Sequence, residues 1–200
     1  MSLFEFDKAY RDKFGLICGV DEAGRGPLAG DVYAAAVVFD EKVAIDGLND
    51  SKKLSAKKRE KLFDEIIEKA RAYSIATASV EEIENLNILN ATFLAMKRAV
   101  DGLAFDLGLV LVDGNKKPSL QYPVETVIKG DSLSASIAAA SILAKVSRDR
   151  YMKTLAEKYP QYEFSKHKGY GTARHRELIL KYGPCEIHRK SFLKKLFKNG

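Results

Sequence analysis

Three short apolar segments that each run into an acidic residue constrain the fold of this chain more than any other feature. Apolar runs of this length, bounded by turn residues, are typical of buried strands. The segments and their acids are residues 16–20 with Asp21-Glu22, residues 109–112 with Asp113, and residues 124–128 with Asp131. The chain is therefore expected to place carboxylates at the ends of three strands.

Helical patterns alternate with the predicted strands. Two further strands are expected at residues 32–39 and 73–78. A first helix is expected after Ser55. A second helical stretch runs from a capping box at Ser79 and Glu82 to Val100, with a break near residues 85–90. Two more helices are expected at residues 134–158 and from about Ala173 to Tyr182. This alternation indicates an α/β fold in which helices flank one mixed five-stranded sheet. Because no Gly-, Pro- or Ser-rich linker interrupts the chain, we expect a single domain over residues 1–200, with a small basic helical portion from about residue 145.

The acidic strand ends suggest a metal site. Ligands of open α/β sheets bind beyond the ends of the strands, where four carboxylates would repel one another unless cations neutralised them. The four are Asp21, Glu22, Asp113 and Asp131. Mg²⁺ takes a few carboxylates and keeps water and phosphate oxygens as its other ligands, and two such ions about 4 Å apart stabilise both oxygens of a phosphoryl displacement. The set indicates metal-assisted phosphodiester chemistry, whereas each acid taken singly is better explained as a strand or helix cap.

The glycine-rich turn after the first strand raises two questions. Adjacent Asp21 and Glu22 point to opposite faces of a regular strand, so both serve one site only if the backbone departs from strand geometry, as Gly24 and Gly26 would permit. The turn also satisfies a GxGxxA dinucleotide pattern over residues 24–29, but it runs into a strand where that fingerprint must open a helix. We therefore interpret it as backbone that can approach a sugar or phosphate closely.

Basic residues are concentrated in the last quarter of the chain. The net charge is +6, yet residues 145–200 carry 15 Lys and Arg against 5 Asp and Glu, a net +10, whereas residues 1–144 carry 18 against 22, a net −4. Residues 165–172 interleave cations with Tyr170, which lies between two glycines just before a helix N-terminus. Cations, amide donors and an accessible ring suit a nucleic-acid backbone and its sugars or bases, although a solvated basic face has the same composition.

Cysteine and histidine usage gives no sign of a structural metal. Cys18 and Cys185 lie far apart without metal spacing, which favours a reducing compartment. The three histidines also lack zinc-ligand spacing, and we interpret them as surface or phosphate-contacting residues. They are His167, His175 and His188. No apolar run approaches the roughly 18 residues of a membrane span, and residues 1–14 lack the apolar core of a secretory signal, so a cytoplasmic chain without membrane contact is expected.

The chain resembles the type 2 ribonucleases H, the ribonuclease HII family, along nearly its whole length. The matching strings are GVDEAGRGP at residues 19–27, DSK at 50–52, LVDG at 111–114, KGD at 129–131, the stretch 138–149 and HKGY at 167–170. The resemblance implies a ribonuclease H-like fold and an endoribonuclease that hydrolyses the RNA strand of RNA–DNA hybrids. It also implies cleavage 5′ of a single ribonucleotide in duplex DNA, with 3′-hydroxyl and 5′-phosphate ends, in ribonucleotide removal and DNA replication or repair.

The same resemblance implies roles for individual residues. The implied catalytic residues, which also bind two Mg²⁺ or Mn²⁺ ions, are Asp21, Glu22, Asp113 and Asp131. The residues implied to bind substrate are Gly24, Arg25 and Gly26, whose backbone contacts the ribose 2′-hydroxyl, Tyr170, which stacks on that sugar, and Lys52, which lies near a phosphate. The chain departs from the family at Asp31, where proline is common. Asp149 is either an auxiliary acid or a partner of Arg148 or Arg150.

Two alternatives compete with this interpretation. The first is another nuclease of the same architecture, such as a type 3 ribonuclease H or a resolvase-like or transposase-like enzyme. Gly24-Arg25-Gly26 argues against a type 3 enzyme, which resembles Gly-Lys-Gly at this place. The second is a non-catalytic nucleic-acid-binding module whose acids are structural, and a metal-dependent cleavage assay separates it from an enzyme.

The C-terminal residues 190–197 faintly resemble a sliding-clamp peptide. Leu193, Leu196 and Phe197 are in place, with lysine where glutamine is expected. A terminal amphipathic helix packed on the domain explains the same pattern. We expect a monomer whose partners are RNA–DNA hybrid and ribonucleotide-containing duplex DNA, with at most a weak clamp contact.

Overall fold

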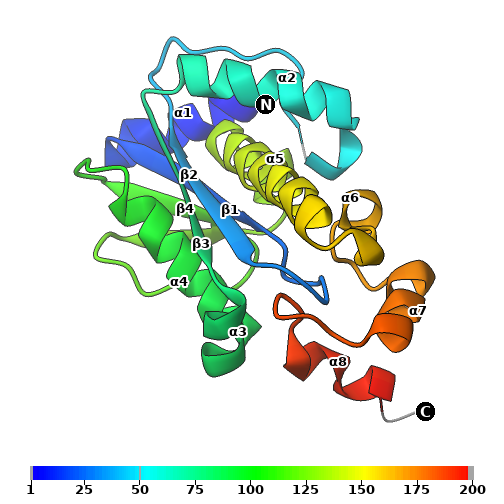
Figure 1. The fold of residues 1–200 in the computed structure, drawn as a ribbon. Helices are drawn as coiled ribbons and strands as arrows, with labels where there is room; N and C mark the ends of the chain where they lie inside the picture. The colour runs from blue at the N-terminus through cyan, green and yellow to red at the C-terminus, as the bar shows by residue number, and fades with distance from the viewer. Residues whose placement is uncertain (1, 50, 198–200) are drawn as a thin grey trace.

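A five-stranded mixed sheet forms the centre of the molecule (Figure 1). The computed structural model describes residues 2–49 and 51–197, apart from the side chain of Lys52. The strands are β1 (Ile17–Ala23), β2 (Val32–Val38), β3 (Ala72–Ala78), β4 (Leu109–Asp113) and β5 (Val124–Val127). Their order is β3-β2-β1-β4-β5, with β1 antiparallel to β2 and parallel to β4. The predicted α/β fold with a mixed five-stranded sheet is confirmed.

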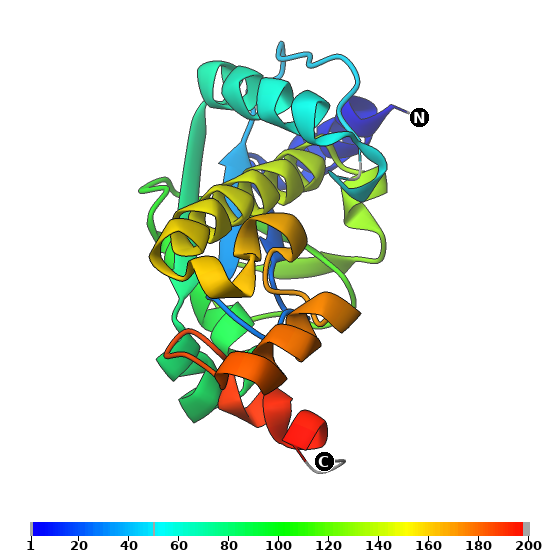
Figure 2. The same ribbon diagram turned by 45° about the vertical axis from the view of Figure 1, so that its right-hand side comes forward.

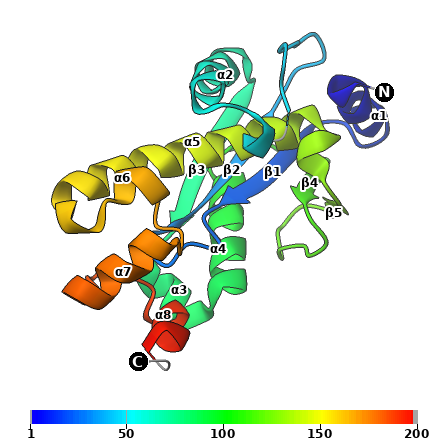
Figure 3. The same cartoon turned by 90° about the vertical axis from the view of Figure 1, so that its right-hand side faces the viewer.

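Helices cover both faces of this sheet. They are α1 (Leu3–Phe14), α2 (Ala56–Lys69), α3 (Val80–Leu86), α4 (Ile88–Asp101), α5 (Ala135–Lys158), α6 (Phe164–His167), α7 (Ala173–Tyr182) and α8 (Lys190–Phe197), with the short 3₁₀ turns η1 (Ser51–Lys53), η2 (Gly130–Ser132) and η3 (Pro160–Tyr162). Apolar side chains of α4 pack on one face and those of α2 and α5 on the other, and Figure 3 shows the sheet between α4 and α5. The break expected near residues 85–90 falls at Asn87, whose φ of 67° separates α3 from α4.

Alternation along β1 decides which helix each of its residues meets. Val20 packs among the side chains on the α4 face. Gly19 faces α5, because a Cβ at this position would overlap the backbone of Ser136. Since successive residues of a strand point to opposite faces, Asp21 lies on the α5 face and Glu22 on the α4 face. The absence of a side chain at Gly19 lets α5 cross the strand closely, just before the acidic pair.

Helix α1 docks against the start of α5. Its Asp7 is fully buried and accepts hydrogen bonds from the Ser134 hydroxyl at 2.5 Å and the Ser136 amide at 2.8 Å. The carboxylate therefore satisfies free donors at the N-terminus of α5. The sequence-based prediction lacks α1, although Ser2 and Glu5 form a capping box at its start, and only the contact of Asp7 with a helix 127 residues further along leaves no local pattern.

The C-terminal portion packs around a small apolar cluster beside the far end of α5 (Figure 2). The cluster joins Met152 and Leu155 of α5 with residues from the following turns and helices, among them Tyr162, Phe164 and Leu178. The chain then enters α8, whose Leu193 is buried, and the predicted terminal helix is confirmed. Within the described residues, no helix is both long and apolar enough to cross a membrane.

Candidate active site at the strand ends

Two of the predicted carboxylates lie side by side on the α5 face of the sheet. The parallel pairing of β1 with β4 ends at Val20 opposite Val112, which brings Asp21 and Asp113 to neighbouring positions just beyond it. Asp21 is 6% exposed and accepts hydrogen bonds from the Glu22 amide at 2.7 Å and from Ser141 of α5. The parallel register of β1 and β4 thus places both acids at one end of the sheet.

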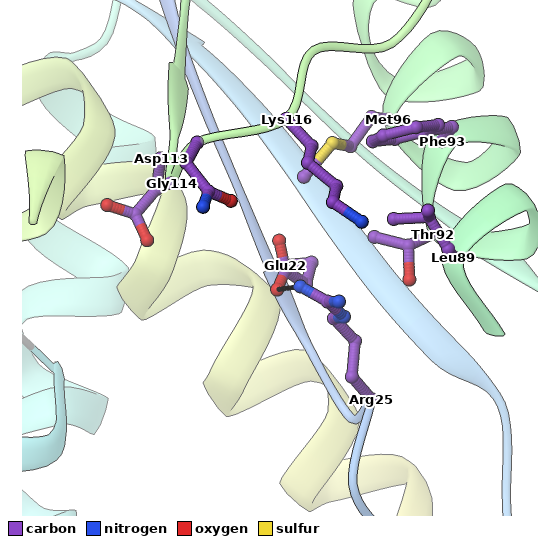
Figure 4. A pocket seen from close by; sticks show the side chains of 10 residues that line it. Glu22, Arg25, Leu89, Thr92, Phe93, Met96, Asp113, Gly114 and Lys116 are labelled. Carbon is purple, nitrogen blue, oxygen red and sulfur yellow. Dashed lines mark hydrogen bonds and ion pairs between the residues drawn. The ribbon is translucent and has the colours of Figure 1, made fainter. Parts of the chain in front are cut away.

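Glu22 takes part from the opposite face without any distortion of the strand. The departure from strand geometry that we expected if both acids serve one site does not occur, because the pairing of β1 with β2 continues regularly through Ala23 opposite Tyr33. Glu22 lines a hollow of about 90 Å³ against α4 together with Asp113, and its carboxylate lies 3.3 Å from the Arg25 guanidinium (Figure 4). Glu22 also lines the cleft next to Asp21, so the end of the sheet gives both faces access to the same region.

The turn before α5 brings Asp131 to the same end of the sheet. The Gly130 amide donates to Asp113 Oδ1 at 2.7 Å, and Lys129 adopts the left-handed conformation, with φ 58°, just before it. Asp131, in η2, is 7% exposed. The four carboxylates Asp21, Glu22, Asp113 and Asp131, called the carboxylate cluster below, are therefore carried to this end of the sheet by β1, β4 and the turn that precedes α5.

Burial and like charges both disfavour the ionised form of Asp21 in this cluster. Burial, followed by the negative charges of Glu22 and Asp113, raises the pKa of Asp21 well above its usual range. Hydrogen bonds from the Glu22 amide and Ser141 oppose this shift of the pKa. The cluster therefore carries unfavourable charge at neutral pH that a bound cation would relieve.

The donor set of the cluster fits a hard divalent ion. Its ligands are carboxylate oxygens, which Mg²⁺ and Mn²⁺ prefer over softer groups. In residues 2–49 and 51–197, no three Asp, Glu, His or Cys side chains are arranged closely enough to hold a metal ion by themselves. An ion that keeps several waters and takes substrate phosphate oxygens needs only one or two carboxylates at a time, so the residues fit such an ion by their chemistry.

A cleft of about 220 Å³ opens beside Asp21 and collects most of the predicted substrate-binding residues. Its lining consists of Asp21, Glu22, Ala23, Gly24, Arg25, Gly26, Ser51, Ser141, Lys145 and Tyr170. The Tyr170 ring is 41% exposed and lies 3.9 Å from the place that a Cβ on Gly26 would occupy. Lys52 belongs to η1 next to Ser51, but its side chain lies outside the described part of the chain.

Two buried arginines hold the glycine loop, defined as residues 24–31. Arg189 donates at 2.6–3.0 Å to the carbonyl oxygens of Gly24, Arg25, Pro27 and Gly30. Arg148 of α5 donates at 3.0–3.1 Å to those of Ala29, Asp31 and Lys168. Burial and the positive charge of Arg148 lower the pKa of Arg189 to about 9. Sequence reasoning misses this role of both arginines, because acceptors so far away in the chain leave no periodic signal.

Two of the three histidines are interior residues, and their predicted place on the surface is wrong. His175 and His188 are 0% and 1% exposed, which leaves them without access to a phosphate. His167 is half-buried, and its ring stacks on that of His175 with centroids 4.2 Å apart.

Two other predicted acids find different partners from those expected. Asp149 pairs with Lys145 one helical turn earlier, at 2.6 Å, and not with either neighbouring arginine. Asp31 accepts a hydrogen bond from the Val80 amide at 3.1 Å, which caps α3. Proline at position 31 would lack this carboxylate, so the departure at this position ties the glycine loop to α3.

Comparisons with known proteins agree along the whole chain. A family model described as Ribonuclease HII matches residues 18–199. A curated "Ribonuclease HII" of Caldicellulosiruptor bescii is 59% identical over 190 residues, which cover 95% of this chain and 92% of that protein. Among solved structures, the ribonuclease H2 from Pyrococcus horikoshii OT3 aligns with a TM-score of 0.75 and 30% identity, over 92% of this chain and 98% of that one. A chain of the PCNA:RNase HII complex from Archaeoglobus fulgidus aligns with a TM-score of 0.65 and 27% identity, over 84% and 88% of the two chains.

Proposed function

Since this chain belongs to the ribonuclease HII family and is thus a metal-dependent endonuclease of the ribonuclease H class, we propose that it cuts 5′ of single ribonucleotides in duplex DNA, besides cleaving the RNA strand of RNA–DNA hybrids. One observation carries the proposal. The cleft that contains Asp21 and Glu22 also contains the glycine loop and Tyr170, so a carboxylate site and a surface suited to a single sugar face the same volume.

The carboxylate cluster is the place where Mg²⁺ or Mn²⁺ would bind. Two bound ions would activate the attacking water and stabilise the departing 3′-oxygen, which leaves a 5′-phosphate. Asp21 and Asp113 hold neighbouring positions across the strands, and the Gly130 amide fixes the orientation of Asp113. We propose that all four carboxylates bind the ions. We also propose that they move into ligating positions when the substrate phosphate arrives.

Recognition of the ribose would come from backbone amides of the glycine loop. Arg189 binds the carbonyl oxygens of Gly24 and Arg25. In a trans peptide the N–H points away from the preceding C=O, so the amides of Arg25 and Gly26 point away from Arg189. Both residues line the cleft. Amides in this position suit a 2′-hydroxyl, which is the group that distinguishes RNA from DNA at a given site.

Tyr170 completes the sugar site from the other side of the cleft. Its ring is partly exposed beside Gly26, and the charged ends of Lys145 and Arg148 lie 5.8 and 5.7 Å from its centroid. A ring held in this way presents a face on which a ribose can stack. We assign Tyr170 to this contact, and we assign Lys52 and the basic residues from 145 onward to the phosphates of the duplex.

The decisive experiment uses a DNA duplex that carries one ribonucleotide. The duplex is incubated with the protein and Mg²⁺ or Mn²⁺, with and without a chelator, and the cut is mapped beside an all-DNA control duplex. We expect one metal-dependent cut on the 5′ side of the ribonucleotide and none in the control. Binding without cleavage under either metal would support a non-catalytic binding module and overturn the proposal.

A weak sliding-clamp contact through α8 is a second proposal, favoured by the solved complex of a PCNA with an RNase HII. Leu193 is buried within this chain, whereas Phe197 is 47% exposed and Leu196 lines a groove. Only the last two positions of the motif are therefore available to a partner. Loss of clamp binding in a Leu196→Ala/Phe197→Ala variant, but not in a control Tyr182→Ala variant, would support the contact, and equal binding by both would exclude it.

We also expect the chain to act in the cytoplasm, as a monomer and as a single domain. Light scattering of the purified protein tests directly whether it is a monomer.

A further inference from the structure

All three histidines of this chain lie together behind Tyr170, with His175 and His188 buried and His167 half-buried. His175 lies in the first turn of α7, His188 lies in the segment between α7 and α8, and His167 ends α6. His175 Nε2 lies 3.1 Å from His188 Nε2. The outer nitrogens of the pair contact the main chain, with His175 Nδ1 2.9 Å from the Tyr170 carbonyl oxygen and His188 Nδ1 3.0 Å from the Cys185 amide nitrogen.

The two backbone groups determine which nitrogen carries each proton. A carbonyl oxygen only accepts, so His175 Nδ1 must be protonated and donate to Tyr170. An amide N–H only donates, so His188 Nδ1 must be unprotonated and accept from Cys185. A neutral ring has one donor and one acceptor, and His188 Nε2–H therefore donates to His175 Nε2. The protons run in a single direction, from the Cys185 amide through both rings to the Tyr170 carbonyl.

The chain of bonds works only while both rings are neutral. A second proton on His175 would place two N–H groups face to face across the 3.1 Å contact, and a second proton on His188 would face the Cys185 amide N–H. Burial lowers the pKa of both His175 and His188 to about 4, in agreement with the neutral form. His167 has its own fixed tautomer, since its Nδ1 accepts from the Gly169 amide and its Nε2 donates to the Tyr162 carbonyl.

Tyr170 needs external support because it lies between two glycines. Gly169 has a φ of 82°, and flanking glycines leave the backbone free to rotate. The carbonyl of Tyr170 accepts from the His175 side chain and from the Thr172 amide at 2.8 Å, and the Tyr170 amide donates to the His167 carbonyl at 2.9 Å. His188 precedes Arg189, the residue that binds the carbonyls of the glycine loop. The segment His188-Arg189 therefore supports both sides of the sugar cleft, Tyr170 through His175 and the glycine loop through Arg189.

We propose that His175 and His188 are positioning residues, which hold Tyr170 in register with the glycine loop through this directed chain of hydrogen bonds. The inference rests on the proposed function in one respect, namely that Tyr170 contacts the ribose. The chain of bonds has only main-chain groups at its two ends, so the thiol of Cys185, 3.1 Å from His188 Nδ1, is dispensable.

The first test reads the tautomers and needs no substrate. Long-range ¹H–¹⁵N correlation spectra of histidine-labelled protein at pH 7 contain only three rings. We expect His175 as the Nδ1–H form and His167 and His188 as Nε2–H forms, none of them doubly protonated. An Nε2–H form of His175, or a charged ring at the His175–His188 contact, would overturn the proposal even in an active enzyme.

The second test measures the effect on the sugar site. His175→Asn keeps a donor near the position of Nδ1, whereas His175→Gln places its amide near Nε2 and loses the bond to Tyr170. We expect His175→Gln to lower kcat/KM on a one-ribonucleotide duplex about tenfold with an unchanged Kd for all-DNA duplex. His175→Asn and the control Cys185→Ala should stay within about twofold of the parent.

A double-mutant cycle separates positioning from a general structural role. On a Tyr170→Ala background, His175→Gln should lower kcat/KM no further, because its target side chain is already absent. An equal loss on both backgrounds would refute the proposal. If His175→Gln fails to fold, His188→Leu, which removes the donor to His175, enters the same cycle with the same expected outcome. Absence of cleavage by the unmodified protein would contradict the proposed function, while the tautomer result would stand by itself.

Discussion

The carboxylate cluster and the support of the glycine loop are both buried polar regions, but their charges are balanced in opposite ways. In the cluster, Asp21 lies beside two other carboxylates that raise its pKa. In the support, Arg148 and Arg189 donate to backbone carbonyls, and the neutral His175–His188 pair has a partner for each ring nitrogen. The first region gains from a ligand that brings positive charge, whereas the second is satisfied before any ligand arrives.

This contrast indicates that the carboxylate cluster takes part in the chemistry, whereas the support of the glycine loop keeps the site in position. Like charges close together are unfavourable until cations bind, so the cluster lowers the stability of the folded protein and raises its affinity for cations. A fully bonded network is rigid and leaves few alternatives, so the support can hold the glycine loop and Tyr170 at a constant separation. Substitutions should therefore affect catalysis without loss of stability in the cluster, and stability together with recognition in the support.

The largest effect is expected from Asp113→Asn. Loss of this carboxylate should lower the cleavage rate about a thousandfold, since metal-ion stabilisation of the transition state is worth several kcal/mol. Folding and duplex binding should be unchanged, as measured by thermal unfolding and by anisotropy of labelled duplex. The exposed Asp106→Asn is the matched control, and near-normal turnover by Asp113→Asn would remove this residue from the metal site.

Asp21→Asn sharpens the same comparison because it removes a repelling charge from a buried position. The raised pKa of Asp21 means that ionisation of this carboxyl opposes folding, and this penalty shrinks as the pH falls below the folded-state pKa and is gone below the unfolded-state pKa. We expect cleavage to be lost while the free energy of unfolding at pH 7, measured without metal, rises. Mg²⁺ should then stabilise the parent more than the variant, and a less stable variant would contradict the electrostatic account.

Arg189→Met should lower the free energy of unfolding, whereas Asp21→Asn should raise it. It leaves the carbonyls of Gly24, Arg25, Pro27 and Gly30 without their donor, and unsatisfied buried groups of this kind cost about 3 kcal/mol or more in total. Urea unfolding should show this loss, whereas exposed Arg174→Met, which breaks surface pairs with Glu163 and Glu177, should cost less than about 1 kcal/mol. Equal losses in both variants would mean that the support adds no special stability.

Acid should weaken the support. The pKa of His175 and of His188 is about 4 in the folded protein, against roughly 6.5 in an unfolded chain. Between these values the unfolded chain binds protons that the folded protein excludes, so the free energy of unfolding falls as the pH drops from about 6.5 to 4.

His188→Gln should reduce this slope, because one of the two histidines no longer titrates. The charged groups that face His188 across the adjoining hollow are Glu81, Glu84, Glu186 and Lys190, and His167 stacks on the far side of His175. None of them is altered by the substitution. Urea unfolding series at several pH values measure the slope, and an unchanged slope would show that His188 is charged in the folded protein.

The smallest effect concerns the basic surface beside the cleft. Lys145 lines the cleft next to Tyr170, so Lys145→Gln should lower the slope of log K against log salt by about 0.9 if it contacts one phosphate. Lys97→Gln, on the outer side of α4 and paired with Asp101, is the control. Identical slopes for the parent and both variants would mean that Lys145 does not face the duplex.

The sequence by itself determined the strands, most of the helices and the acids at the strand ends. Short apolar runs and helical spacing report burial of neighbouring residues. The acids Asp21, Asp113 and Asp131 lie next to such runs, so their places at strand ends were predictable from local pattern, whereas the strand order and register that bring these ends together were not. The motif resemblance added the glycine loop and Tyr170 as neighbours of these acids.

Only the tertiary structure decided what holds that site in place. Arg189 finds its carbonyls more than 150 residues earlier in the chain, His175 meets His188 across a loop, and Asp7 caps a helix that begins at Ala135. It also decided that Glu22 reaches the cleft from a regular strand. Hydrogen bonds of this kind depend on the positions of single atoms in packed elements, whereas hydrophobic periodicity records only which face of an element is buried.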